Sequence, residues 1–244
     1  RTNVLGTHVL LEAARCSWGG NDANPVTGGR RLFLQVSTDE VYGCLDEKGR
    51  FDEESPLQPN NPYSASKASA DLLVRSYHQT YGFPAIVTRC CNNYGPYQFT
   101  EKFIPLLITR AFADATLPIY GNGRNVRGWL YVEDHCEAIM LVLRKGEFGK
   151  VYNIGAGAER RNVEVAEHIL RIMNKPATLI SFVSDRLGHD WRYASDNGRI
   201  SDLGWEPTHR FEDGLEQTIR WYLENQDWWK SRSPASPGRS DGQE

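Results

Sequence analysis

Short apolar runs and longer stretches of helical spacing follow one another through most of the chain. Residues 32–36 and 85–90 are apolar runs bounded by polar residues, which is typical of buried strands. Between them, apolar residues in the range 68–77 repeat at the spacing of a helix. Strands that alternate with helices in this way predict an α/β fold with a parallel sheet.

The alternation continues toward the C-terminus, with shorter segments after residue 116. An N-terminal helix is expected with apolar positions at Val4, Val9, Leu10, Leu11 and Ala14. Further helices are expected at residues 103–112, 133–143, 163–173 and 211–224. Further strands are expected at residues 117–121, 129–132, 151–154 and 178–183. We therefore expect a smaller α/β lobe from residue 117 onward, interleaved with the first sheet.

Polar residues collect where the first strand ends. The run at 32–36 is followed by Ser-Thr-Asp-Glu-Val-Tyr-Gly, and open α/β sheets bind ligands at the carboxyl ends of their strands. Asp39 and Glu40 would point to opposite faces if the strand continued, so both reach one ligand only if the backbone turns at Thr38. Adjacent carboxylates are usually just solvated in a loop. The motif that follows favours a catalytic pair instead.

That second motif is Tyr63-Ser-Ala-Ser-Lys67, whose two functional residues lie four apart on one face of a helix. Residues 60–62, Asn-Asn-Pro, mark the helix start. A free phenol titrates near pH ~10, and each unit of lowering requires about 1.4 kcal/mol of preferential stabilisation of the phenolate. A neighbouring ammonium can supply part of it. Tyr-x-x-x-Lys alone occurs by chance in many helices, but after the preceding strand motif it indicates an acid–base pair.

Composition limits the remaining functions. The 244 residues carry a net charge of −3 with scattered basic residues, so we expect no nucleic-acid partner. No apolar stretch approaches the ~18 residues of a membrane span. The sequence contains five cysteines and no Cys-x-x-Cys spacing. An odd number of cysteines without this spacing is typical of reduced thiols and predicts a cytoplasmic protein. No His-x-x-x-His pair occurs, and we expect no metal.

The two motifs, together with the blocks at residues 92–97, 101–105 and 185–189, resemble the extended short-chain dehydrogenase/reductase superfamily. The resemblance extends to about residue 229. Within the superfamily the chain resembles the nucleoside-diphosphate-glucose 4,6-dehydratases, and residues 91–99 resemble the dTDP branch more than the UDP branch. Four residues differ from those that the family commonly carries: Thr100, Gly128, Leu187 and Trp191.

The resemblance implies a Rossmann-like parallel sheet, incomplete at its N-terminus, with a smaller interleaved α/β substrate-binding lobe. Family members open with a Gly-x-x-Gly-x-x-Gly turn that this sequence does not contain, so we expect N-terminal βαβ units of on the order of 60–90 residues to be missing. Residues 1–116 would be the C-terminal part of the NAD-binding domain, with the catalytic motifs. Residues 117–230 would mainly form the nucleotide-sugar lobe, with interleaved Rossmann elements. Residues 231–244, which lack apolar content, are expected to be a disordered tail.

The activity implied by the resemblance is NAD-dependent dehydration of dTDP-glucose to dTDP-4-keto-6-deoxyglucose, by a homodimer when full length. Tyr63, assisted by Thr38 and Lys67, would take the proton of the hydroxyl at sugar carbon 4 while hydride passes to NAD. Glu40 would remove the proton on carbon 5, and Asp39 would protonate the hydroxyl that leaves carbon 6. Hydride would then return to carbon 6.

Binding residues also follow from the resemblance. NAD would contact Tyr63, Lys67 and Asn93. The nucleotide sugar would contact Thr38, Asn92, Lys102, Phe103, Pro118, Ile119, Tyr120, Arg127, Asn153, Asp185, Arg186, Leu187, Gly188 and His189. Two alternatives stay open: a UDP-sugar dehydratase or decarboxylase of the same superfamily, and a non-catalytic nucleotide-sugar-binding fragment. We expect the chain as given to be inactive or weakly active.

Overall fold

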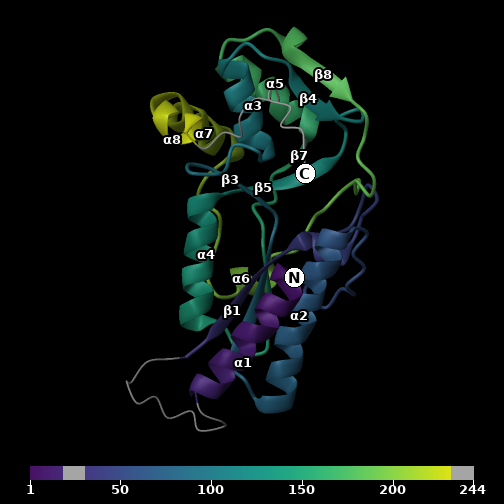
Figure 1. Ribbon diagram of the computed structural model, residues 1–244, viewed down its shortest axis with the longest axis vertical. Coiled ribbons are helices and arrows are strands. Elements are labelled where there is room, and N and C mark those ends of the chain that lie inside the picture. Colours follow the sequence, from purple (N-terminus) through teal and green to yellow (C-terminus); the bar gives the residue numbers. More distant parts are fainter. Residues whose placement is uncertain (19–30, 232–244) are drawn as a thin grey trace, which may run out of the picture.

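The computed structural model describes residues 1–18 and 31–231. The expectations for most of the glycine-containing loop at 17–29 and for the tail at 231–244 lie outside these residues. A three-stranded parallel sheet of order β1-β2-β6 forms the lower part of the molecule in Figure 1; its strands are β1 (Phe33–Thr38), β2 (Ala85–Cys90) and β6 (Val151–Ile154).

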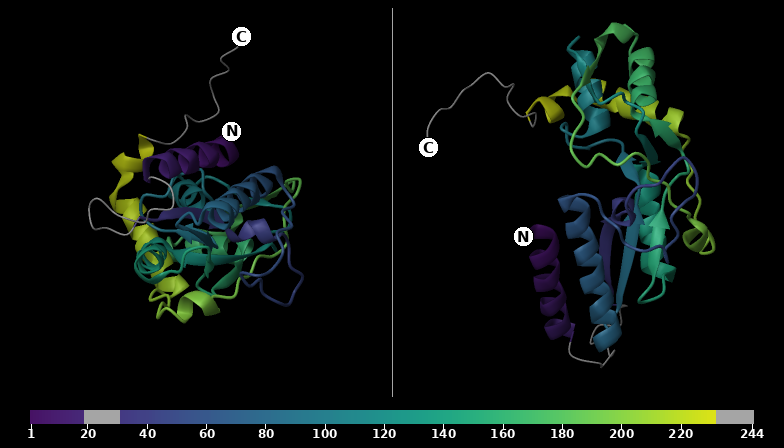
Figure 2. Two further views of the ribbon diagram at one scale, coloured as in Figure 1. Left: turned by 90° about the horizontal axis from the view of Figure 1, so that it is seen from below. Right: turned by 90° about the vertical axis from the view of Figure 1, so that its right-hand side faces the viewer.

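Helices cover both faces of this sheet. The helices α1 (Thr7–Trp18) and α2 (Pro62–Tyr81) lie side by side on one face, and α4 (Val132–Lys145) lies on the other (Figure 2). Alternate residues of β2 serve the two faces: Ala85 and Val87 pack toward α1 and α2, whereas Ile86 packs toward α4. Burial on both faces explains why this strand is a continuous apolar run in the sequence.

The upper lobe contains two smaller sheets and four helices (Figure 1). Its strands are β3 (Asn92–Tyr94), β4 (Leu117–Tyr120), β5 (Val126–Tyr131), β7 (Glu159–Arg161) and β8 (Ile180–Val183). Its helices are α3 (Phe103–Phe112), α5 (Asn162–Ile172), α7 (Phe211–Glu224) and α8 (Gln226–Lys230). The order β3-β5-β7 pairs β5 with β3 in parallel and with β7 antiparallel, and β4 pairs with β8 in parallel. Side chains of α3, α5 and α7 share one core with these strands.

Each strand and helix expected from the sequence is present, and the differences are local. Residues Thr2–Gly6 form a π-helical turn before α1, and Leu11 is buried while Val9 and Leu10 face outward. The expected strand at 178–183 begins only at Ile180, because a 3₁₀ turn follows Pro176. The strands β3 and β7 and the helices α6 (Gly198–Ser201) and α8 were not expected.

Residues 43–61 form a long connection to α2 that contains no helix. This connection lies beside residues 190–196, which link the upper lobe to the lower part of the molecule. Leu45 N donates to Arg192 O at 3.0 Å, and Phe51 N donates to Ala194 O at 2.9 Å. Asn60 Nδ2 donates to Asp190 Oδ1 at 2.6 Å. The two segments therefore hold each other at the junction of the lobes. In the part of the chain described, no helix combines the length and apolar character that crossing a bilayer requires.

Candidate functional site

The backbone turns where β1 ends, as expected. Thr38 keeps extended angles, and Asp39–Tyr42 then form a 3₁₀ turn whose Glu40 N donates to Thr38 Oγ1 at 3.3 Å. Thr38 thus acts as the cap of the turn. The turn breaks the alternation of a strand and allows Asp39 and Glu40 to serve the same end of the sheet.

Asp39 is 2% exposed and lies among groups that disfavour its ionised form. Burial, with a smaller contribution from the charge of Glu40, raises the pKa of Asp39 to about 7, against the opposing charge of Arg127. Thr38 Oγ1 donates to Asp39 Oδ1 at 3.3 Å, and Oδ2 has no hydrogen-bond partner among the described residues. A carboxyl group that keeps its proton near neutral pH can act as a general acid.

Glu40 is tied to the first turn of α2. Ser64 Oγ lies 3.0 Å from both Glu40 Oε2 and Asn61 Oδ1, so its one hydroxyl proton can be donated to either oxygen. Ser64 N donates to Asn61 Oδ1 at 2.9 Å. Asn61 is the N-cap of α2 and Pro62 its first residue, so the helix start read from the sequence is confirmed. The role of Ser64 was not anticipated, although it lies next to Tyr63 in the motif. This chain of bonds holds the two catalytic motifs together.

The chain without its cofactor does not lower the pKa of Tyr63. Tyr63 lies half-exposed on α2, and burial together with the charge of Glu40 raises its pKa. Lys67 Nζ donates instead to Val36 O of β1 at 2.7 Å. Two carboxyl groups lie near the phenol and disfavour its ionised form, while the Lys67 ammonium is held by a backbone carbonyl. In the chain alone, Tyr63 is therefore a phenol at neutral pH.

Several of the expected binding residues gather in the upper lobe, beyond the end of β4. His189 Nδ1 lies 2.7 Å from Asp185 Oδ1, and the His189 ring is edge-on to the half-exposed Tyr120 ring at 6.4 Å. Arg186 and Leu187 lie in the exposed loop between Asp185 and His189, and Leu187 is wholly exposed. Tyr120 thus presents an aromatic face beside a group of charged side chains.

Another group of expected residues lies around β3 and the start of α3. Asn93 Nδ2 donates to Cys90 Sγ at 3.3 Å and to Cys91 O at 3.2 Å. Lys102 is largely exposed beside Glu101, whereas the Phe103 ring stacks on Trp129 at 6.0 Å. The remaining residues are placed as follows: half-buried Asn92 in β3, and Pro118 and buried Ile119 in β4.

Two expected ligand contacts are engaged within the fold. Arg127 is buried and donates to Asp190 O at 2.8 Å and to Trp191 O at 3.2 Å. Asn153 is fully buried; its Oδ1 accepts from Tyr42 Oη at 2.7 Å and its Nδ2 donates to a backbone carbonyl. Gly188 takes a φ of 66° and would meet Asn60 O at 3.5 Å with a Cβ. Contacts of these residues with a substrate stay predictions.

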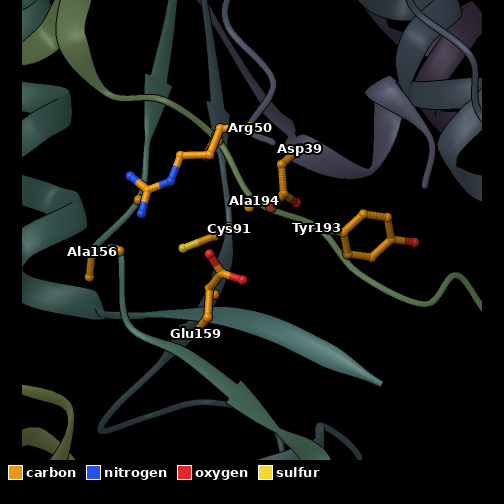
Figure 3. Close-up of a pocket in the computed structure, with 11 residues that line it drawn as sticks. Asp39, Arg50, Cys91, Ala156, Glu159, Tyr193 and Ala194 are labelled. Atoms are coloured by element: carbon orange, nitrogen blue, oxygen red, sulfur yellow. The ribbon is translucent and has the colours of Figure 1, made fainter. Parts of the chain in front are cut away.

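Asp39 also lines a pocket that sequence reasoning missed (Figure 3). Its lining comes from segments far apart in the chain: Asp39, Arg50, Cys91, Gly128, Gly155, Ala156, Gly157, Glu159, Tyr193, Ala194 and Ser195. No local pattern marks these residues, because only the long-range pairing of residues 43–61 with 190–196 and of β5 with β7 brings them together. Within residues 1–18 and 31–231, no group of three or more His, Cys, Asp or Glu side chains is placed to hold a metal ion.

Known proteins resemble this chain along nearly all of its length. The family model described as GDP-mannose 4,6 dehydratase matches residues 1–218. A dTDP-glucose 4,6-dehydratase of Xanthomonas campestris is 53% identical over 241 residues, which cover 93% of this chain and 67% of that protein. A dTDP-glucose 4,6-dehydratase of Escherichia coli is 49% identical over 250 residues, covering 94% and 68%.

Solved structures match the same family as the sequence comparisons. The dTDP-glucose 4,6-dehydratase of Bacillus anthracis, in complex with NAD, matches with a TM-score of 0.87 and 49% identity over 95% of this chain and 71% of that one. The enzyme of the same name from Streptomyces venezuelae, also with NAD bound, matches with a TM-score of 0.87 and 47% identity, over 95% and 69%. The Rossmann-like fold expected from the sequence is confirmed, and the chain spans about two thirds of the relatives' length. Sequence and structure together place the chain in the family of the dTDP-glucose 4,6-dehydratases.

Proposed function

We propose that this chain carries the catalytic groups of an NAD-dependent lyase that converts dTDP-glucose to dTDP-4-keto-6-deoxyglucose. The observation that carries the proposal is the pairing of a buried Asp39, whose pKa is raised to about 7, with the neighbouring Glu40 on one turn. Elimination of water needs an acid and a base at adjacent carbons, and the two environments separate these roles. Support comes from the names of the relatives, which are dTDP-glucose 4,6-dehydratases.

In this reaction Tyr63, Glu40 and Asp39 each transfer one proton. Tyr63 Oη accepts the proton of the hydroxyl at sugar carbon 4, with Lys67 and Thr38 nearby to stabilise the charge. Glu40 takes the proton from carbon 5 and Asp39 delivers its own proton to the hydroxyl oxygen at carbon 6, which leaves as water. Bound NAD supplies the acceptor for hydride from carbon 4 and the donor that returns it to carbon 6.

The residues present fit one end of that cofactor. Asn93 Oδ1 is buried without a hydrogen-bond partner among the described residues and lies just beyond β2, beside the end of β1, where it could accept a bond from a carboxamide. The half-exposed ring of Tyr63 offers an adjacent surface. The glycine-rich turn that holds a dinucleotide pyrophosphate is not in this sequence, so weak binding of NAD by the chain alone is expected.

The nucleotide would lie in the upper lobe. Tyr120 provides a stacking face for the base, and Arg186, His189 and Lys102 provide donors for the diphosphate. In this proposal residues 1–116 carry the cofactor and catalytic part and residues 117–230 mainly the substrate part, although α3 packs with α5 and α7 in the upper lobe. We also propose a cytoplasmic location, which the five free thiols support.

The experiment that tests this function uses a chimaera. The segment that precedes the matched region in the Xanthomonas relative is joined to this chain, and product is followed by mass spectrometry with dTDP-glucose and, as control, UDP-glucose. We expect a dTDP product lighter by one water molecule. Asp39→Asn should slow elimination by about 10²–10⁴-fold yet spare oxidation, so that NADH accumulates transiently.

Two results would contradict the proposal. Preferential turnover of UDP-glucose would assign the chain to the other branch. A block of NADH formation in Asp39→Asn, measured by stopped-flow absorbance, would remove Asp39 from the elimination step and place it in the oxidation step.

A further inference from the structure

The proposed reaction leaves one residue short of a proton at the end of every turnover. Tyr63 gains the proton of the carbon-4 hydroxyl, and Glu40 gains the carbon-5 proton and returns it to carbon 5 as hydride arrives at carbon 6. Asp39 gives its proton to the departing water and recovers none from the sugar. The protein is therefore reset only when Tyr63 releases its extra proton and Asp39 gains one, so that no proton is consumed overall. A route between solvent and Asp39 would serve the second of these steps, and this inference rests on the proposed function.

The pocket beside Asp39 has the geometry of such a route. Asp39 and Glu159 enter it from opposite sides, with the Cys91 side chain between them in the view of Figure 3. Asp39 Oδ2 is a buried acceptor with no partner among the described residues. The space between has room for about one water molecule, and polar groups line it, which is the condition for an ordered water.

The pocket opens to solvent through a polar mouth. Arg50 is exposed, and the carboxylate of Glu159, which is paired with Arg192 at 2.6 Å, is partly exposed. Tyr193 also lines the pocket, but its hydroxyl donates to Asp190 Oδ2 at 2.5 Å. Because the Tyr193 hydroxyl already donates to Asp190, the charged side chains of the lining that reach solvent are Arg50 and Glu159, and we assign the mouth of the pocket to these two residues.

Charged and titratable groups face Asp39 from every neighbouring element. They are Glu40 on the same turn, Arg127 on β5, Tyr63 on α2, Cys90 at the end of β2, Cys91 just after it, and Arg50, Glu159 and Tyr193 across the pocket. Burial raises the pKa of both thiols, Cys90 to about 12, so neither is a competing acid near neutral pH. Tyr63, Glu40 and Lys67 do not line the pocket, and it is thus separate from the face on which they act.

We propose that this pocket holds a water hydrogen-bonded to Asp39 Oδ2, and that Asp39 regains its proton from solvent through this water and past Arg50 and Glu159. The proton enters from solvent at the mouth, passes to the water, and a second proton of that water passes to Oδ2, which restores the carboxylic acid. No oxidant or further reactant is needed.

Gly128 gives a way to close the route. It lies opposite Glu159 in the pairing of β5 with β7, and a Cβ there would lie 3.2 Å from Cys91 Cβ and 3.5 Å from Cys91 Sγ. Its φ is outside the left-handed region, so alanine brings no backbone strain. Gly128→Ala therefore adds a methyl group to the pocket lining, tight against Cys91, whose side chain must shift slightly, and the methyl group does not contact the Asp39 carboxyl group. We expect it to narrow the pocket. Gly6→Ala, with nothing within 4 Å of its Cβ, is the matched control.

Two measurements on the chain itself test the water without any turnover. A high-resolution crystal structure should show a water within hydrogen-bonding distance of Asp39 Oδ2, absent in Gly128→Ala. The pKa of Asp39, followed by carboxyl-carbon NMR, should rise by roughly 0.5–1 unit in Gly128→Ala, because the carboxylate loses its solvating water, and stay unchanged in Gly6→Ala. A dry pocket in the unsubstituted chain overturns the proposal even if Gly128→Ala fails to fold. So does an unchanged pKa in the folded variant.

The kinetic test uses the chimaera. In Gly128→Ala the first turnover should keep its rate, because Asp39 begins protonated, whereas later turnovers should slow by at least about tenfold. Equal slowing of the first and later turnovers would indicate a structural effect and overturn the role in proton supply. Absence of any dehydratase activity in the unsubstituted chimaera would contradict the proposed function, and the crystallographic and NMR results would still decide the water.

Discussion

Asp39 couples the stability of the protein to pH, because the fold favours its protonated form. The folded pKa of about 7 lies above the ordinary value of 3.8, so the folded state binds more protons than the unfolded state between these two values. The contribution of Asp39 to stability is therefore highest below pH 4 and falls as pH rises toward 7.

This dependence gives a prediction. Asp39→Asn removes the cost of the buried charge and should raise the free energy of unfolding at pH 8 by about 1–3 kcal/mol, with little effect at pH 4. Urea denaturation at the two pH values measures it. Glu40→Gln, which changes the adjacent carboxyl group, is the control. An equal effect of Asp39→Asn at both pH values would show that the buried charge is not the cause.

The roles of Tyr63 and Lys67 can be distinguished in the chimaera by the pH dependence of turnover. Tyr63→Phe removes the hydroxyl that accepts the proton, and Lys67→Met removes the charge that would favour the phenolate once the site is complete. Both should lower turnover at neutral pH by about 10²–10⁴-fold. A pH–rate profile should show partial recovery in alkali for Lys67→Met and none for Tyr63→Phe. Full activity of Tyr63→Phe would exclude it as the base.

At the scale of elements, the first turn of α2 is the part on which the site depends most. Asn61 caps this helix and, through Ser64, fixes Glu40. Asn61→Ala should lower the free energy of unfolding by about 1 kcal/mol. Asn61→Asp, which keeps an acceptor at the same place, should restore most of it. Urea denaturation compares the two, and equal stability of Asn61→Ala and the unsubstituted chain would contradict the capping role.

The elements that could be predicted from the sequence are those whose own residues show a recognisable pattern. The apolar run of β2 reflects burial on both faces, and Asn61-Pro62 reflects the chemistry of a helix start. By contrast β3 and β7 have three residues each, too few to show a period, and depend on pairing with β5. The proposed catalytic residues lie in two short motifs that the sequence shows, whereas Arg50 and Glu159 line the pocket with Asp39 only through tertiary contacts.

At the scale of the whole molecule, α1, the turn before it and α2 lie side by side and carry exposed apolar residues. The apolar residues Leu5, Val9 and Leu10, and Leu72 of α2, are each more than half exposed. Exposed apolar residues on adjacent helices are typical of protein–protein contacts. We propose that the homodimer expected of the full-length protein forms through these residues.

Leu10→Asp tests the dimer. In the chimaera, a charge in this surface should shift the protein from dimer to monomer in sedimentation velocity, because burying it unpaired in an interface is costly. Leu187→Asp, at a fully exposed position of the upper lobe, should leave the assembly unchanged. A monomer before any substitution, or a dimer that Leu10→Asp does not weaken, would exclude this face.

The pairing of residues 43–61 with 190–196 also bears on the order in which the molecule folds. Arg192 Nη1 donates to Asp46 O, a carbonyl 146 residues earlier in the chain, and neither segment has a helix of its own to order it. Closing so long a loop costs entropy before its contacts form, so each segment must wait for the lobe cores that bring both together. The pairing of residues 43–61 with 190–196 should thus be the last part to form and the first to open. The residues around Asp39 then reach their final positions only after both lobes have packed.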